Sequence, residues 1–142
     1  MQPSYQFIDH TADILFQAEG NTPSELFEQC ALALENSQVD LSKIEPVIKK
    51  EWKATNHRID SMLFDFLDDL LFFKDTEQLL FCKFQIDVQE KEGEFFMTVS
   101  AWGENLNIEK HQPKVDVKAI TMHMFEVKKT DIGWWAKVLI DI

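Results

Sequence analysis

The fold of this chain is decided by one stretch, IDSMLFDFLDDLLFFK, which runs from Ile59 to Lys74. Apolar side chains recur in it at intervals of three and four residues, the spacing of one face of an α-helix, so the sequence predicts a helix over 59–74. One apolar stripe comprises Ile59, Leu63, Phe66, Leu67, Leu70 and Phe73. Because further apolar side chains between Met62 and Phe72 widen that surface, we expect the helix to lie between a sheet and a second helix.

The second helix is predicted upstream, and it begins after Thr22 and fades near residues 35–37. Thr22 is placed to cap the helix, Pro23 occupies its first position, and Glu25 follows three residues after the cap. This pattern is typical of a capping box, which satisfies backbone N–H groups that a helix leaves free at its start. The apolar stripe that follows comprises Leu26, Phe27, Cys30, Ala31 and Leu34.

The remaining segments have the composition and the alternation of β-strands. Strands are expected over residues 5–9, 14–18, 47–54, 84–88, 95–102, 115–127 and 134–142, with a hairpin turn at 91–94. Separate runs of strands and helices favour an α+β fold. We therefore expect a single domain over 1–142, a two-layer sandwich in which two helices pack on one face of a mixed, six- to seven-stranded sheet.

Composition narrows the classes of function. The chain has 142 residues, with 14 Lys and Arg against 25 Asp and Glu, and a formal net charge of −11. Such a charge disfavours direct nucleic-acid binding, because an acidic surface repels a phosphate backbone, and it favours a divalent cation or a basic protein partner. No apolar run approaches the roughly 20 residues of a membrane span, and the first residues do not resemble a secretory signal. With Cys30 and Cys82 both among apolar neighbours, we expect a cytoplasmic protein with two buried thiols.

One candidate site lies between the first two predicted strands. Asp9 and Asp13 flank the residues His10-Thr11-Ala12. In a continuous strand the two carboxylates would share a face but lie about 13 Å apart, too far to bind one cation. A turn at Thr11-Ala12 would aim one of them toward a common point. Without such a turn, the stretch is an ordinary polar strand end.

A second candidate site lies at the other end of the sequence. Asp141 precedes Ile142, whose terminal carboxylate we expect to be ordered by the final strand; the alternative is a frayed acidic tail. Carboxylate oxygens are hard donors that suit Ca²⁺ or Mg²⁺ better than Zn²⁺.

Other kinds of chemistry find little support in the sequence. The four histidines, His10, His57, His111 and His123, have no zinc-site spacing, although His123 lies in a predicted strand where it could line a site. The sequence contains no nucleophile elbow, Gly-rich phosphate loop or dinucleotide-binding fingerprint. The residues alone therefore predict an acidic α+β domain with a candidate cation site, and they name no reaction.

Taken together, several motifs resemble the archease family. They are Asp9-His10-Thr11-Ala12-Asp13, Gly20-Asn21-Thr22, Glu25-Leu26-Phe27, Ser61-Met62-Leu63-Phe64-Asp65-Phe66-Leu67, Ala101-Trp102-Gly103-Glu104, His111, Val117-Lys118-Ala119-Ile120-Thr121, His123 and Asp141-Ile142. The resemblance covers essentially the whole chain. It implies a protein that is no enzyme itself and that activates an RtcB-type RNA ligase in tRNA splicing and RNA repair. The activator would promote guanylylation of the ligase by GTP and multiple turnover, while the ligase itself binds GTP and RNA.

The resemblance also implies which residues act. The metal ligands would be Asp13, Asp141 and a main-chain oxygen of Ile142, with Ca²⁺ as the expected cation and Mg²⁺ or Mn²⁺ as alternatives. Candidates for contact with the partner and for activation are Asp9, His10, Lys118 and His123.

The sequence departs from the family pattern at two places, and two other functions stay open. Met122 stands where the family usually has Tyr, and the stretch 57–60 replaces a more acidic one, so docking to the partner could differ. One alternative is a metal-dependent hydrolase or nucleotide-processing enzyme that uses the same carboxylates. The other is an interaction module in which the cation only holds the C-terminus.

Overall fold

The computed structural model describes residues 1–10 and 12–142. In chain order its elements are β1 (Ser4–Ile8), β2 (Ile14–Gly20), α1 (Pro23–Gln38), the 3₁₀ helix η1 (Leu41–Lys43), β3 (Ile48–Asn56), α2 (Ile59–Glu77), β4 (Leu79–Lys91), β5 (Glu94–Asn105), α3 (Ile108–His111), β6 (Ala119–Lys129) and β7 (Trp134–Asp141). The expected order of two strands, helix, strand, helix and four strands is confirmed. The short elements η1 and α3 were not predicted.

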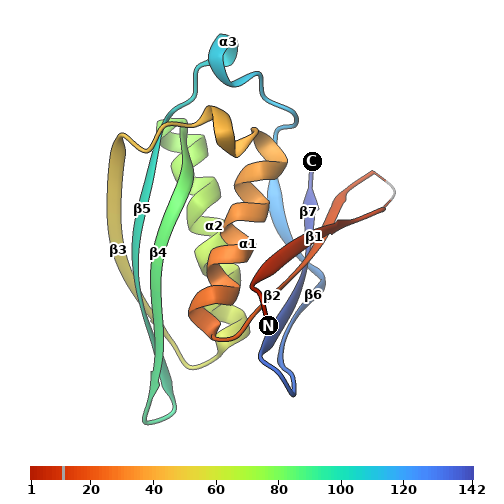
Figure 1. The fold of residues 1–142 in the computed structure, drawn as a ribbon, viewed down its shortest axis with the longest axis vertical. Coiled ribbons are helices and arrows are strands. Elements are labelled where there is room, and N and C mark those ends of the chain that lie inside the picture. Colours follow the sequence, from red (N-terminus) through yellow and green to blue (C-terminus); the bar gives the residue numbers. More distant parts are fainter. Residues whose placement is uncertain (11) are drawn as a thin grey trace.

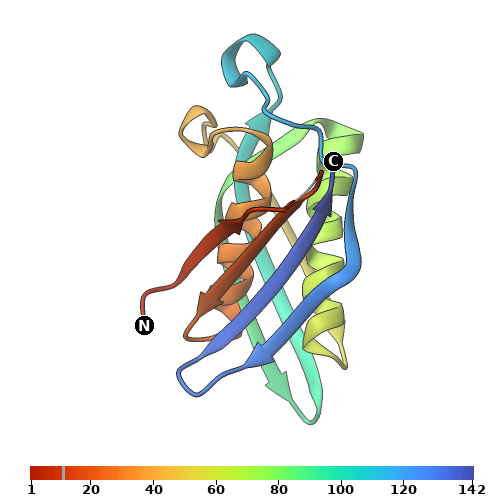
Figure 2. The ribbon, with the colours of Figure 1, turned by 90° about the vertical axis from the view of Figure 1, so that its right-hand side faces the viewer.

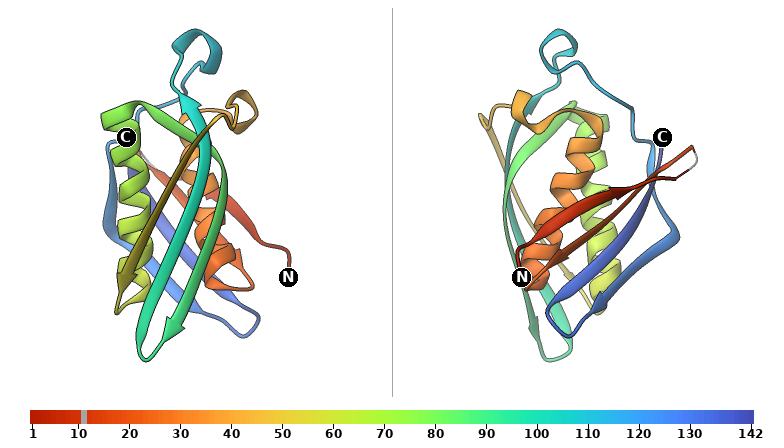
Figure 3. Two further views of the ribbon diagram at one scale, coloured as in Figure 1. Left: turned by 90° about the vertical axis from the view of Figure 1, so that its left-hand side faces the viewer. Right: turned by 45° about the vertical axis from the view of Figure 1, so that its right-hand side comes forward.

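The strands form two sheets, with the helices α1 and α2 between them (Figures 1 and 3). One sheet has the order β1-β2-β7-β6 and the other β3-β5-β4, and all neighbouring strands are antiparallel. The α+β class, the seven strands and the two main helices agree with the sequence-based expectation. The expectation of one mixed sheet with helices on one face was wrong, because each helix contacts both sheets.

The side chains of α2 show why the helix needs two sheets. Phe66 is fully buried, and its ring centroid lies 5.9 Å from that of Phe27 on α1 and 6.3 Å from that of Trp52 on β3. On another face of the same helix, Phe64 packs edge-to-face at 5.4 Å against Phe125 of β6 in the opposite sheet. The wide apolar surface of the helix is thus used on both sides, although Phe72 is 61% exposed and takes no part in it.

The start of α1 confirms the predicted cap. The Thr22 side chain accepts a hydrogen bond from the N–H of Glu25, and Pro23 is the first residue of the helix. The carboxylate of Glu25 turns back to the N–H of Asn21, one residue before the position that a standard capping box uses. The helix continues to Gln38, beyond the predicted end, so its polar last turn is part of the structure.

Two further expectations concern thiols and membranes. Cys30 is buried on α1 whereas Cys82 is half-buried, so only one of the two thiols is enclosed as expected. Among the described residues, no helix is both long enough and apolar enough to cross a membrane.

Candidate functional site

The register of the four-stranded sheet brings the loop between β1 and β2 next to the C-terminus. Strand β2 pairs with β7, and the last pair at one end of this ladder is Ile14 with Ile140. Continued by one residue, this register sets Asp13 opposite Asp141. Directly opposed residues of an antiparallel pair carry their side chains on the same face, with Cβ atoms roughly 5 Å apart. Figure 2 shows this end of the sheet, where the loop after β1 lies near the C-terminus.

The alternation of the strands defines the face on which both carboxylates lie. Phe16 of β2 and Val138 and Ile140 of β7 are fully buried in the core between the sheets. Successive side chains of a strand point to opposite faces, so Asp141 of β7 lies on the outer face of the sheet, and the register continued by one residue would set Asp13 on the same face. Asp141 is exposed and Asp13 half-buried. We call the group formed by Asp13, Asp141 and Ile142 the apex.

The loop between β1 and β2 supplies the turn that the sequence left open. Ala12 has a φ of 71°, in the left-handed region, so the strand does not run straight from Asp9 to Asp13. Asp9 and His10 are exposed in this loop. Thr11, the other residue of the expected turn, lies outside the described residues.

Lys118 joins the apex from the other side of β7, whereas His123 does not. The N–H of Lys118 donates a 2.8 Å hydrogen bond to the carbonyl of Asp141, and Ala119 pairs with Asp141 in the ladder. His123 lies four residues beyond Ala119, about 13 Å at the usual rise of a strand. It falls in a segment where the pairing of β6 with β7 is interrupted and Met124 has a φ of 60°. His123 is exposed there, so the structure gives it no contact with the apex.

The donors at the apex are chemically suited to a hard divalent cation. Two carboxylates and a main-chain oxygen of Ile142 are the kind of ligands that Ca²⁺, Mg²⁺ and Mn²⁺ prefer. In the part of the chain that the structure describes, no three side chains of His, Cys, Asp or Glu come together as a metal cluster. A cation at the apex would therefore depend on the main-chain oxygen as well as on Asp13 and Asp141.

One histidine of the family-like motifs has a structural role. His111 is fully buried: its Nε2 lies 2.7 Å from a carboxylate oxygen of Glu104, and its Nδ1 accepts a hydrogen bond from the N–H of Asn107. Both ring nitrogens thus hold α3 to the end of β5, and neither is available to bind a metal ion.

Sequence reasoning missed a group of buried polar side chains near the end of α1. Glu35 and Gln38 are 0% and 2% exposed, and Lys74 of α2 keeps only 11% of its side-chain surface in contact with solvent. The only signal in the sequence was a polar run at the end of an amphipathic helix, which normally indicates solvent.

These features define a class of small α+β proteins in which two sheets enclose two helices and an acidic apex combines the start of β2 with the C-terminus. Residues 5–142 match the Archease protein family (MTH1598/TM1083), and the chain belongs to that family. It is 37% identical to the protein archease of Methanosarcina mazei, over 97% of this chain and 95% of the relative. It is 36% identical to the protein archease of Pyrococcus furiosus, over 97% and 98% of the two chains. The solution structure of Methanobacterium thermoautotrophicum protein 1598 superposes with a TM-score of 0.86 at 38% identity, over 97% of this chain and 98% of that one.

Proposed function

We propose that this chain activates an RNA ligase of the RtcB type in tRNA splicing and RNA repair, and that it has no catalytic activity of its own. It would do so by promoting guanylylation of the ligase by GTP and by allowing multiple turnover. Membership of the archease family supports the class of function. The observation that supports the mechanism is the β2–β7 register, because its last pair, Ile14 with Ile140, is followed directly by Asp13 on one side and Asp141 on the other.

A divalent cation fits the oxygen donors of the apex. Asp13, Asp141 and the main-chain oxygen of Ile142 would hold it. When bound, the ion supplies positive charge that can offset the negative charge developing on a triphosphate. Asp13 and Asp141 would bind the cation and orient it on the outer face of the sheet. The hydrogen bond from the N–H of Lys118 to the carbonyl of Asp141 holds the main chain beside them. Asp9, His10, Lys118 and His123 are all exposed and would contact the ligase.

The charge of the chain suits a basic partner. A net charge of −11 attracts a ligase whose nucleotide cleft is positive, and such attraction speeds encounter. Because salt screens charges on exposed surfaces, activation should weaken as ionic strength rises.

The test is a multiple-turnover ligation assay with the ligase limiting. Asp13→Asn and Asp141→Asn keep the shape of the side chains and remove the charge that the proposal uses, so each should lower activation at least tenfold. The matched control is Asp131→Asn, an exposed residue in the turn between β6 and β7 at the far end of the same sheet, and it should activate like the unchanged protein.

Two results would contradict the proposal. Full activation by both apex variants would exclude the carboxylates from the mechanism, and no effect of the unchanged protein on ligation would exclude the function. A metal-dependent hydrolase or nucleotide-processing enzyme gains no support from the comparisons with known proteins. Nucleotide turnover by the isolated chain would be its signature.

A further inference from the structure

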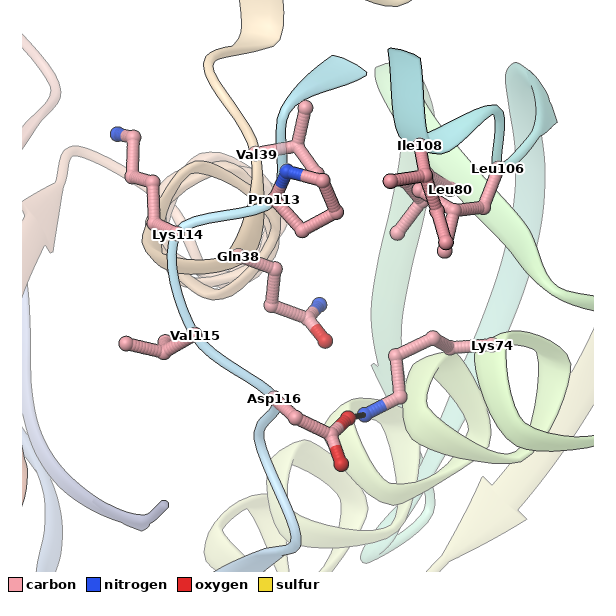
Figure 4. Close-up of a pocket in the computed structure, with 10 residues that line it drawn as sticks. All are labelled: Gln38, Val39, Lys74, Leu80, Leu106, Ile108, Pro113, Lys114, Val115 and Asp116. Carbon is pink, nitrogen blue, oxygen red and sulfur yellow. Dashed lines mark hydrogen bonds and ion pairs between the residues drawn. The ribbon is translucent and has the colours of Figure 1, made fainter.

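A cavity of about 440 Å³ opens at the C-terminal end of α1, and none of its lining residues belongs to the apex. Residues at the ends of α1 and α2 line it together with the segment 113–116, which leads to β6 (Figure 4). Much of the lining is apolar, from Val39, Leu80, Leu106, Ile108 and Pro113. A volume of this size is within the range of sites that bind small molecules.

The side chain of Gln38 points into this cavity (Figure 4). Gln38 is only 2% exposed, and within the described chain neither its Nε2 nor its Oε1 has a hydrogen-bond partner. Its main chain is held in place, since its carbonyl accepts a 2.7 Å hydrogen bond from the N–H of Lys114. A buried amide with both its donor and its acceptor free is unusual, because each unmet group is unfavourable. Neither atom is open to solvent in this structure, so the amide must turn further into the cavity before an occupant can pair with its donor and its acceptor.

The charges around the cavity are already paired. The ammonium of Lys74 lies 2.9 Å from the carboxylate of Asp116 and also donates to the carbonyl of Val117. The ammonium of Lys114 donates to the carbonyl of Asn36, and its side chain points away from the cavity (Figure 4). A charged ligand would have to break these pairs or remain without a counter-charge. The cavity therefore suits a neutral occupant.

We propose that this cavity binds a neutral, flat ring molecule that carries a cyclic amide, a lactam, at one edge. A lactam places an N–H beside a carbonyl, so it can pair with Oε1 and Nε2 of Gln38 at the same time once the amide has turned into the cavity. A carboxylate would satisfy only the Nε2 group and would face Oε1 with like charge, and a hydrocarbon would satisfy neither. The apolar body of the ring would lie against Val39, Leu80 and Ile108. This binding site is independent of the proposed action on a ligase.

The test uses 2-quinolinone and its N-methyl derivative, which have nearly the same apolar body but differ in the N–H donor. Each is titrated into the ¹⁵N-labelled full chain, and the backbone amide signals of residues 114–116 and the side-chain amide signal of Gln38 are followed by NMR. We expect 2-quinolinone to shift these signals and to bind at least tenfold more tightly than the N-methyl derivative.

Two variants complete the test. Gln38→Leu keeps the size of the side chain and removes both polar atoms, so it should weaken 2-quinolinone binding at least tenfold while the spectrum stays that of a folded protein. Gln6→Leu, on the exposed face of β1, should leave the affinity unchanged. Equal affinity for the two ligands would overturn the proposal even if Gln38→Leu failed to fold. Amide signals of residues 114–116 that do not move at the solubility limit of 2-quinolinone would overturn it as well.

Discussion

Glu35 lies in the last turns of α1 with its carboxyl group completely enclosed. One oxygen, Oε2, accepts a hydrogen bond from the N–H of Phe81 on β4, and the other has no partner among the described residues. Burial raises the pKa of Glu35 to about 8, although the Phe81 N–H and the charge of Lys74 act in the opposite direction. The carboxyl group is therefore protonated at neutral pH in the folded protein and ionised in the unfolded one. Glu35→Gln keeps its shape and removes the titration.

The size of the effect follows from the two pKa values. Between the ordinary value of 4.5 and the folded value of about 8, the folded state holds one proton more than the unfolded state. Stability then falls as pH rises, by about 1.4 kcal/mol per pH unit. The contribution of the protonated carboxyl group is fully present below pH 4.5 and lost above pH 8. At pH 7, some 2.5 units above the unfolded value, the loss is about 3 kcal/mol.

The assay is urea unfolding of both proteins from pH 5.5 to 9. Relative to the unchanged chain, Glu35→Gln should gain about 3 kcal/mol of unfolding free energy between pH 5.5 and 8, and the difference should be constant above that range. The control is Glu109→Gln, an exposed residue of α3, which should follow the unchanged protein at every pH. A difference between Glu35→Gln and the parent that does not vary with pH would refute a protonated Glu35, and one that shrinks as pH rises would reverse the sign of the argument.

Three other substitutions test the packing. Gly103→Ala would place a Cβ 1.7 Å from the carbonyl oxygen of Leu80, so the main chain of β4 or β5 must move; we expect a loss of about 3 kcal/mol or more, visible as a lower Tm, and an unchanged Tm would contradict the close approach. Thr22→Ala removes the side chain that caps α1 and should lower the free energy of unfolding, measured in urea, by about 1 kcal/mol. An unchanged free energy would show that the N–H of Glu25 finds another hydrogen-bond acceptor. Phe66→Ala should cost about 3–5 kcal/mol in the same assay, and less than 1 would show that the core can collapse around it.

The helices could be predicted from the sequence more completely than the sheets. The pattern over 59–74 shows how much of a helix is apolar, and this indicated burial on more than one side. It does not show whether the second neighbour is a helix or a sheet. Strands of both sheets alternate in the same way, since each has one face toward the helices, so alternation alone cannot assign a strand to a sheet. The division into β1-β2-β7-β6 and β3-β5-β4 depends on long-range hydrogen bonding, which leaves no local pattern.

The sequence indicated which residues belong to the apex more readily than it indicated how they are arranged in space. Asp13 and Asp141 stand out because each is a carboxylate at the end of an apolar strand. Their proximity depends on the pairing of Ile14 with Ile140, and only the structure shows that register. His123 illustrates the opposite case. Regular alternation in β6 would allow it to line a site, but the interruption between Thr121 and Glu126 removes the regular pairing at its position. Its role stays a prediction about contact with a partner.

The polar end of α1 shows why the cavity could not be predicted at all. Glu35, Asn36, Ser37 and Gln38 look like the fading end of a helix, because polar residues at a terminus usually face water. The structure instead continues the helix through them and buries Glu35 and Gln38. Glu35 is stabilised there by a residue distant in the sequence, because its carboxylate accepts a hydrogen bond from the N–H of Phe81 on β4. The side-chain amide of Gln38 has no such partner in the described chain. Because its hydrogen-bond partner comes from β4, we assign Glu35 a role in the stability of the fold. An unpartnered amide beside a cavity is better explained by ligand binding. The two substitutions distinguish these roles, because Glu35→Gln should change the pH dependence of stability whereas Gln38→Leu should change the affinity for a lactam.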